Sequence, residues 1–125
     1  MVRIPITASR LPSGPAVVIS SDVNGADDFI LDGKGDAFIA GNGQNNLAFL
    51  GPEGGNTTIL AGALLEDSTL LAGPSAVQFG QRETDRKRRS LYITTTAGNA
   101  SGANNAKLGV SRVDLQRIAH YDRGF

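Results

Sequence analysis

Short apolar segments recur along this chain, and polar turn residues separate them. Each segment is rich in Val, Ile, Phe, Tyr or Thr and is bounded by Gly, Asn, Asp or Pro, a pattern typical of β-strands. The predicted strands are residues 2–6, 16–20, 28–31, 37–40, 47–50, 57–61, 76–79, 91–95 and 110–115. The sequence therefore predicts an all-β protein.

Two glycine-rich stretches are typical of tight turns between these strands: 32–36 (DGKGD) and 51–55 (GPEGG). Glycine reaches the positive φ angles that hairpin turns require. The acidic residues of 32–36 are faintly similar to a calcium loop, but the later ligands and closing Glu of that motif are missing. We predict a hairpin turn there. Residues 61–72 contain several leucines, and we expect a loop that packs them rather than a helix.

The strand pattern repeats with a period of about 48 residues, because GADDFILD at 25–32 aligns with GPSAVQFG at 73–80. Antiparallel four-stranded units of this length are typical of β-propeller blades. The predicted fold is an incomplete β-propeller of about 2.6 four-stranded blades. Its expected parts are a partial blade (1–24), a complete blade (25–72), a partial last blade (73–115) and a C-terminal tail (116–125).

A propeller ring needs about four to eight blades, so a chain of this length is not expected to close a ring alone. Its terminal strands would then be open edges, which pair readily with another chain. We therefore expect a tendency to self-associate through these edges.

Lys plus Arg number 12 and Asp plus Glu number 12, so the net charge is near zero. This balance argues against nucleic-acid binding or membrane attachment through bulk positive charge. Cysteine is absent, which excludes disulfides, thiolate metal sites and a cysteine nucleophile. Residues 1–12 lack the apolar core of a secretory signal, and no apolar run approaches the length of a transmembrane helix. The default expectation is a cytoplasmic protein.

Two stretches resemble consecutive blades of the regucalcin and gluconolactonase-like six-bladed β-propellers: 25–41 (GADDFILDGKGDAFIAG) and 72–96 (AGPSAVQFGQRETDRKRRSLYITTT). The later stretch carries Phe79-Gly80 followed by LYITT at 91–95, and 110–114 fits the closing strand. The details most resemble the fungal branch of this group, which includes lactonase-like proteins and the hetero-Diels–Alderases of tropolone sesquiterpenoid pathways. The resemblance implies a role in secondary metabolism, acting on a small-molecule metabolite.

The resemblance also implies one metal ligand. Asp27 falls where metal-dependent members bind a divalent cation at the mouth of the central channel. A carboxylate there would suit Ca²⁺, Mg²⁺ or Mn²⁺ and could help to activate a water for lactone opening. The family's flanking Pro and Gly are Ala26 and Asp28 here, and its other ligands are not in this chain. The alternative is that Asp27 or Asp28 accepts backbone N–H groups in a turn.

The densest run of charge is 82–89 (RETDRKRR). Basic clusters can bind nucleic acid or direct nuclear import, but this one holds two acids and no aromatic residue. We predict a solvated loop between two strands. His120 is the only histidine and lies in the expected tail, so no Ser-His-Asp arrangement is indicated and no catalytic residue is assigned.

Three functional hypotheses follow. The chain is a truncated member of the lactonase-like family, whose activity would require a cation and Asp27. Alternatively, it is a fragment of a hetero-Diels–Alderase-like cyclase, which would gain rate by holding diene and dienophile together without a metal. The third hypothesis is a non-catalytic assembly module or an inactive gene remnant. Truncation is suggested because Met1 lies just ahead of an expected third strand, in the middle of a blade.

Overall fold

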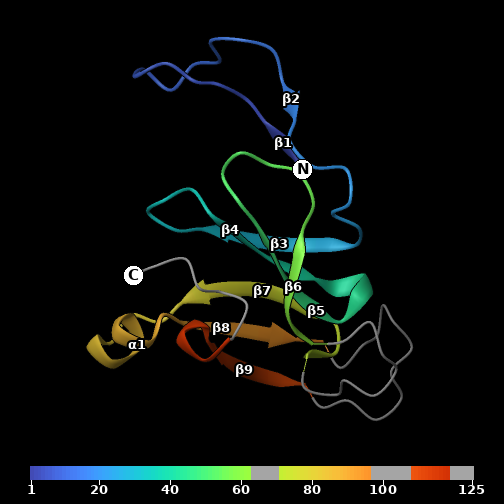
Figure 1. The fold of residues 1–125 in the computed structure, drawn as a ribbon, viewed down its shortest axis with the longest axis vertical. Coiled ribbons are helices and arrows are strands. Elements are labelled where there is room, and N and C mark those ends of the chain that lie inside the picture. Colours follow the sequence, from blue (N-terminus) through green and yellow to red (C-terminus); the bar gives the residue numbers. More distant parts are fainter. Residues whose placement is uncertain (63–70, 97–107, 119–125) are drawn as a thin grey trace.

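The computed structural model describes residues 1–62, 71–96 and 108–118 (Figure 1). Three antiparallel sheets follow one another along the chain. The first pairs β1 (Val2–Arg3) with β2 (Val17–Val18). The second contains, in chain order, β3 (Ala26–Leu31), β4 (Ala37–Gly41), β5 (Asn46–Leu50) and β6 (Thr58–Gly62). The third contains β7 (Pro74–Phe79), β8 (Ser90–Thr95) and β9 (Gly109–Asp114).

The all-β prediction is confirmed, because every apolar segment predicted as a strand contains one. The main difference is the length of β1, which ends at Arg3 instead of reaching residue 6. Pro5 lacks the backbone N–H that a longer ladder would need, and only an isolated bridge between Ile6 and Pro12 follows it. The hairpin turn predicted at 32–36 is present between β3 and β4.

β3 and β7 share the same local backbone at equivalent points of the repeat. Gly25 and Gly73 precede the two strands with φ angles of 61° and 59°. The register then shifts between Ala26 and Asp28 in β3, as it does between Pro74 and Ala76 in β7. A β-bulge of this kind leaves one extra residue without a cross-strand partner. The sequence repeat is therefore also a repeat of backbone conformation.

The larger hydrophobic core lies between the four-stranded and three-stranded sheets, where β7 contacts β3 and β4. The ring of Phe38 is at its centre, 5.8 Å from the Phe49 ring centroid and 5.4 Å from that of Phe79. The edge-to-face arrangement with Phe79 is a favourable aromatic geometry. The buried residues are Phe38, Ala40, Leu47, Phe49, Leu71, Val77, Leu91, Ile93 and Leu115.

A second core lies on the other face of the four-stranded sheet. Its buried members are Ala37, Ile39, Ala48 and Leu50, and residues from the N-terminal segment pack against them (Met1, Ile19 and Val23). Because successive side chains of a strand point to opposite faces, β4 and β5 contribute to both cores. The four-stranded sheet is therefore covered on both sides along its two central strands.

Polar contacts also connect the sheets. Asp28 on β3 accepts a hydrogen bond from the Val77 backbone N–H of β7 at 3.0 Å. Asn45, beside the 3₁₀ helix η1 (Asn42–Gln44), accepts one from the Gly73 N–H at 2.8 Å. These contacts set the positions of the two repeats relative to each other.

The prediction of a solvated loop at 82–89 was wrong, because the segment forms helix α1 (Glu83–Arg88). Asp85 is buried and accepts hydrogen bonds from the Arg82 backbone N–H at 3.3 Å and the Tyr92 hydroxyl at 3.1 Å. The acids lie in the first turn and the bases in the last, which complements the helix dipole. The order of acidic and basic residues along this segment, together with the buried Asp85, therefore favours a helix over the predicted loop.

Another 3₁₀ helix, η3 (Leu115–Arg117), follows β9. Most of the 61–72 segment and the tail with His120 lie outside the described residues, so the expectations for them are not addressed. Among the residues that are described, no helix has the length and apolar character needed to cross a membrane.

Leu91→Ala is expected to lower the free energy of unfolding by about 2–5 kcal/mol, because Leu91 is fully buried in the larger core. Leu108→Ala is the matched control, since Leu108 lies next to β9 with 74% of its surface exposed. That control should change stability by less than about 0.5 kcal/mol. Urea denaturation followed by circular dichroism measures both, and equal losses would contradict the assignment of the core.

Acidification should destabilise the fold partly through Asp22. The Ser20 hydroxyl and the Thr57 backbone N–H donate to this carboxylate at 2.6 and 2.8 Å, and they lower the pKa of Asp22 below 3.8. Because the pKa of Asp22 is lower in the folded state, its charged form stabilises the fold at pH values above the pKa of the unfolded state. This stabilisation is lost as the pH falls through the pKa of the folded state. Asp22→Asn should therefore be less stable at neutral pH and lose less stability below about pH 4. Equal acid dependence of the two proteins in pH-dependent denaturation would contradict this.

Candidate functional site

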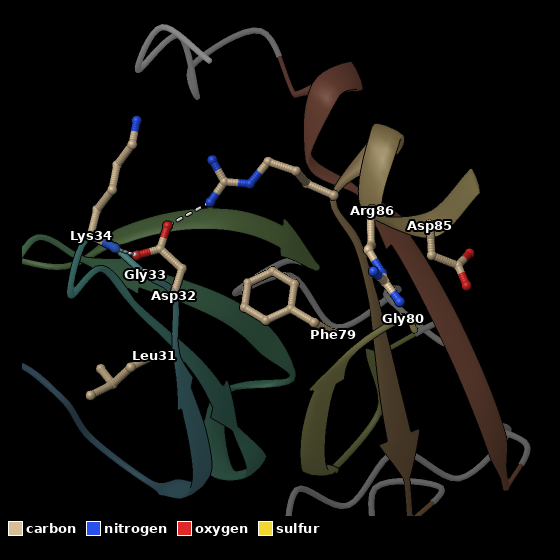
Figure 2. A pocket seen from close by; sticks show the side chains of 9 residues that line it. Leu31, Asp32, Gly33, Lys34, Phe79, Gly80, Asp85 and Arg86 are labelled. Atoms are coloured by element: carbon tan, nitrogen blue, oxygen red, sulfur yellow. Dashed lines mark hydrogen bonds and ion pairs between the residues drawn. The ribbon is translucent and has the colours of Figure 1, made fainter. Parts of the chain in front are cut away.

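A cleft of about 460 Å³ lies where the β3–β4 turn approaches the segment from β7 to α1 (Figure 2). It is formed by residues that are far apart in the sequence but lie at the same end of two neighbouring sheets. The lining residues are Leu31, Asp32, Gly33, Lys34, Phe79, Gly80, Asp85, Arg86 and Arg89.

Asp32 organises the wall formed by the β3–β4 turn. One carboxylate oxygen, Oδ1, accepts hydrogen bonds from the backbone N–H groups of Lys34 at 2.8 Å and Asp36 at 3.0 Å. This is the local side-chain-to-backbone bonding that makes Asp favourable in turns. Gly35 completes the turn with φ at 84°, a value that L side chains rarely adopt. The turn places Lys34 at the rim, with its side chain extended away from the sheet (Figure 2).

The other carboxylate oxygen of Asp32 forms an ion pair with Arg89 Nη2 at 2.5 Å. The Arg89 side chain is 17% exposed and that of Asp32 is 8% exposed, so both charges are largely removed from water. Arg89 follows the last residue of α1 in the left-handed conformation, with φ at 51°. This ion pair therefore ties the end of the helix to the turn of the neighbouring sheet.

Arg86 of α1 is held differently. Its Nε and Nη2 atoms donate to the Gln81 carbonyl oxygen at 3.0 and 2.9 Å. Among the residues that the structure describes, no carboxylate forms an ion pair with it. Asp85 is nearby in sequence, but its carboxylate points away from the cleft and accepts the Tyr92 hydroxyl bond (Figure 2). Glu83, the other acid of this helix, pairs with Lys87, so neither acid forms an ion pair with Arg86.

The floor of the cleft is apolar. The Phe79 ring lies below the ion pair, whereas the Leu31 side chain, at the end of β3, points away from that ring (Figure 2). Phe79 is held from the core side by the edge-to-face contact with Phe38. None of the described lining residues is a Ser, Thr, Cys or His; they are charged residues, glycines and the apolar Leu31 and Phe79.

Asp27, the predicted metal ligand, lies at the opposite end of β3. It is exposed and occupies the unpaired position of the bulge. Its Oδ2 accepts a hydrogen bond from the Asn42 side-chain amide at 3.5 Å. Asp28, the alternative turn residue, instead accepts the backbone N–H of Val77 from the neighbouring sheet.

The donors around Asp27 do not complete a cation site within the described part of the chain. No group of three or more His, Cys, Asp or Glu residues that could hold a metal occurs among the described residues. Ca²⁺ takes about six to eight oxygen ligands, and Mg²⁺ requires near-octahedral geometry. Asp27 would therefore be one ligand of a site that needs further donors.

A second cleft of about 310 Å³ lies between β1 and β3 and is almost entirely apolar. Among the described residues that line it, Arg3 alone has a charged side chain, and this side chain donates to the Pro52 carbonyl oxygen at 3.2 Å. Phe29 and Leu31 also line it, from the face of β3 that points away from the larger core. About half of each of these two side chains is exposed.

Sequence reasoning noticed the DGKGD turn and the basic run separately and did not bring them together. The signal was present in the repeat, because Asp32 and Gly80 occupy equivalent positions after the first strands of their units. Segments that follow equivalent strands of adjacent sheets lie at the same end of the stack. The alignment of the two repeats therefore already indicated that the β3–β4 turn and the segment after β7 would be neighbours.

No protein-family model matches this chain, and no curated protein matches it.

Arg89→Met should lower the free energy of unfolding by about 2–3 kcal/mol, because it leaves the mostly buried Asp32 carboxylate without its ionic partner. Lys87→Met is the matched control, since Lys87 pairs with Glu83 at 2.7 Å through side chains that are 73% and 81% exposed. The control should cost less than about 1 kcal/mol. Chemical denaturation of both variants tests this, and equal costs would show that the buried pair has no special role.

Proposed function

We propose that this chain forms successive blades of a lactonase-like β-propeller similar to the regucalcin and gluconolactonase-like proteins, and that it acts on a small-molecule metabolite. The observation that carries the proposal is the repeated backbone of β3 and β7, each with a positive-φ glycine followed by a bulge. Both strands are the first in their sheets, and they contact each other. Adjacent first strands of successive antiparallel sheets are what neighbouring propeller blades require.

The bulge gives Asp27 a particular place in this proposal. Bulges often re-aim a side chain next to an active site. Asp27 is the unpaired residue of the β3 bulge, and Ser75 is its equivalent in β7. In a lactonase-like propeller Asp27 would supply one carboxylate to Ca²⁺, Mg²⁺ or Mn²⁺, which would polarise the lactone carbonyl or activate a water. The remaining donors would come from outside the described residues.

Hydrolysis of a sugar lactone such as gluconolactone, measured as acid release with each cation and with EDTA, tests this proposal. The full chain should accelerate hydrolysis only with a cation, and Asp27→Ala should reduce the rate more than about 100-fold. Glu53→Ala is the control, because Glu53 is an exposed acid in the turn at the opposite end of the same sheet. Absence of acceleration with every cation, or an unchanged rate in Asp27→Ala, would overturn the lactonase proposal.

A second candidate is an assembly module, favoured by the outward face of the β1–β2 hairpin. Val2 and Val18 are cross-strand partners that are 55% and 69% exposed, and Ile4 continues the same face. The outer face of the opposite sheet is more polar, with the cross-strand set Gln78, Tyr92 and Arg112. If copies of the chain stacked head to tail, the apolar hairpin face would contact the polar outer face of the β7–β9 sheet. The hairpin face is therefore better matched by the same face of a second copy in a two-fold dimer.

Val18→Lys should weaken self-association at least about tenfold, because each subunit would bury a charge in an apolar contact. Val110→Lys is the control, since Val110 is comparably exposed on β9 at the other end of the stack. Sedimentation velocity over a range of protein concentrations measures the effect. A wild-type protein that stays monomeric, or equal weakening by both substitutions, would contradict the module.

A further inference from the structure

The cleft between the β3–β4 turn and α1 has the size of a small-molecule site. Its volume of about 460 Å³ lies within the range of about 300–1,000 Å³ that is usual for ligand pockets. It lies at the end of β3 opposite Asp27, so it is separate from the site considered under the proposed function.

Arg86 is pre-organised to meet a ligand. Two of its guanidinium nitrogens are bound to the Gln81 carbonyl oxygen, which fixes the plane of the group. Its third nitrogen, Nη1, makes no hydrogen bond or ion pair with any residue that the structure describes. A guanidinium fixed in this way loses little conformational entropy when it binds a carboxylate.

The charges that face the cleft do not cancel. Asp32 is the acid on the cleft side, and it is paired with Arg89. Arg86 adds a positive charge on the helix side of the cleft, and no described carboxylate forms an ion pair with it. The region therefore has a positive potential although the whole chain is neutral, and a concave site concentrates such a field.

The apolar floor determines the rest of the ligand. Phe79 is only partly buried, and its ring is fixed by Phe38. A planar apolar group would pack on the Phe79 ring in offset or edge-to-face geometry. A fully hydrated ion would leave this surface uncovered.

We propose that this cleft binds a small organic carboxylate that carries an apolar ring. Arg86 binds the carboxylate, while the Phe79 ring contacts the apolar ring of the ligand. The Asp32–Arg89 pair keeps the two walls together and limits the positive charge. This site is independent of lactone hydrolysis, because none of its residues contributes to the Asp27 locus.

Benzoate is the probe, titrated into ¹⁵N-labelled full-length chain and followed by NMR and calorimetry. Amide shifts should be centred on Gly33, Lys34 and Gly80, and the dissociation constant should rise with salt because the attraction is ionic. Acetate lacks the ring and benzyl alcohol lacks the charge, so each should bind at least about tenfold more weakly than benzoate.

Arg86→Gln should raise the benzoate dissociation constant about tenfold. Arg88→Gln is the matched control, because it removes the same charge from the same helix at a residue that does not line the cleft. Thermal unfolding of both variants checks that the fold is intact. Equal weakening by both variants would mean diffuse charge attraction only and would overturn the proposal. Shifts centred on the Asp27 end, or equal binding of acetate and benzoate, would overturn it as well.

Discussion

The burial of β4 and β5 on both faces is the constraint on which the rest of this structure depends. Every residue of these two strands is buried, including those that point to opposite sides of the sheet. A sheet with two apolar faces needs a layer on each side, because exposed apolar surface is costly in water. The N-terminal segment supplies one layer and the β7–β9 sheet supplies the other. The order of the layers thus follows the order of the chain.

The contact between the second and third sheets also creates the cleft. Asp28, Ile30 and Asp32 share one face of β3 by strand alternation, and all three are directed towards the third sheet or its helix. The apolar residue in the middle of this row contributes hydrophobic contact. The acids at its two ends contribute a directional hydrogen bond and an ion pair. The bonds fix how the sheets are placed, since hydrophobic burial alone is not directional. The walls of the cleft consequently stand at a defined separation.

The two ends of β3 have different chemistry. At its start, the bulge presents an exposed Asp27 carboxylate near the Asn42 amide. At its end, the positively charged rim surrounds an apolar floor. The two proposals therefore assign a cation to the first end and an anion to the second, at opposite ends of one strand. The lactonase proposal depends on the first end and the carboxylate proposal on the second, which is why the two can fail independently.

The sequence alone determined the strands and their repeat, because alternation of apolar residues and glycine-rich turns are local signals. It also indicated the turn at 32–36, since Asp and Gly act there within a few residues. It did not reveal α1, whose Asp85 is satisfied partly by Tyr92 on the next strand. The repeat placed the β3–β4 turn and the segment after β7 at the same end of adjacent sheets, but the pairing of Asp32 with Arg89 was decided only by the tertiary structure. The physical reason is that contacts between segments far apart in the sequence depend on how two sheets pack. A local sequence pattern does not determine the separation between the two sheets.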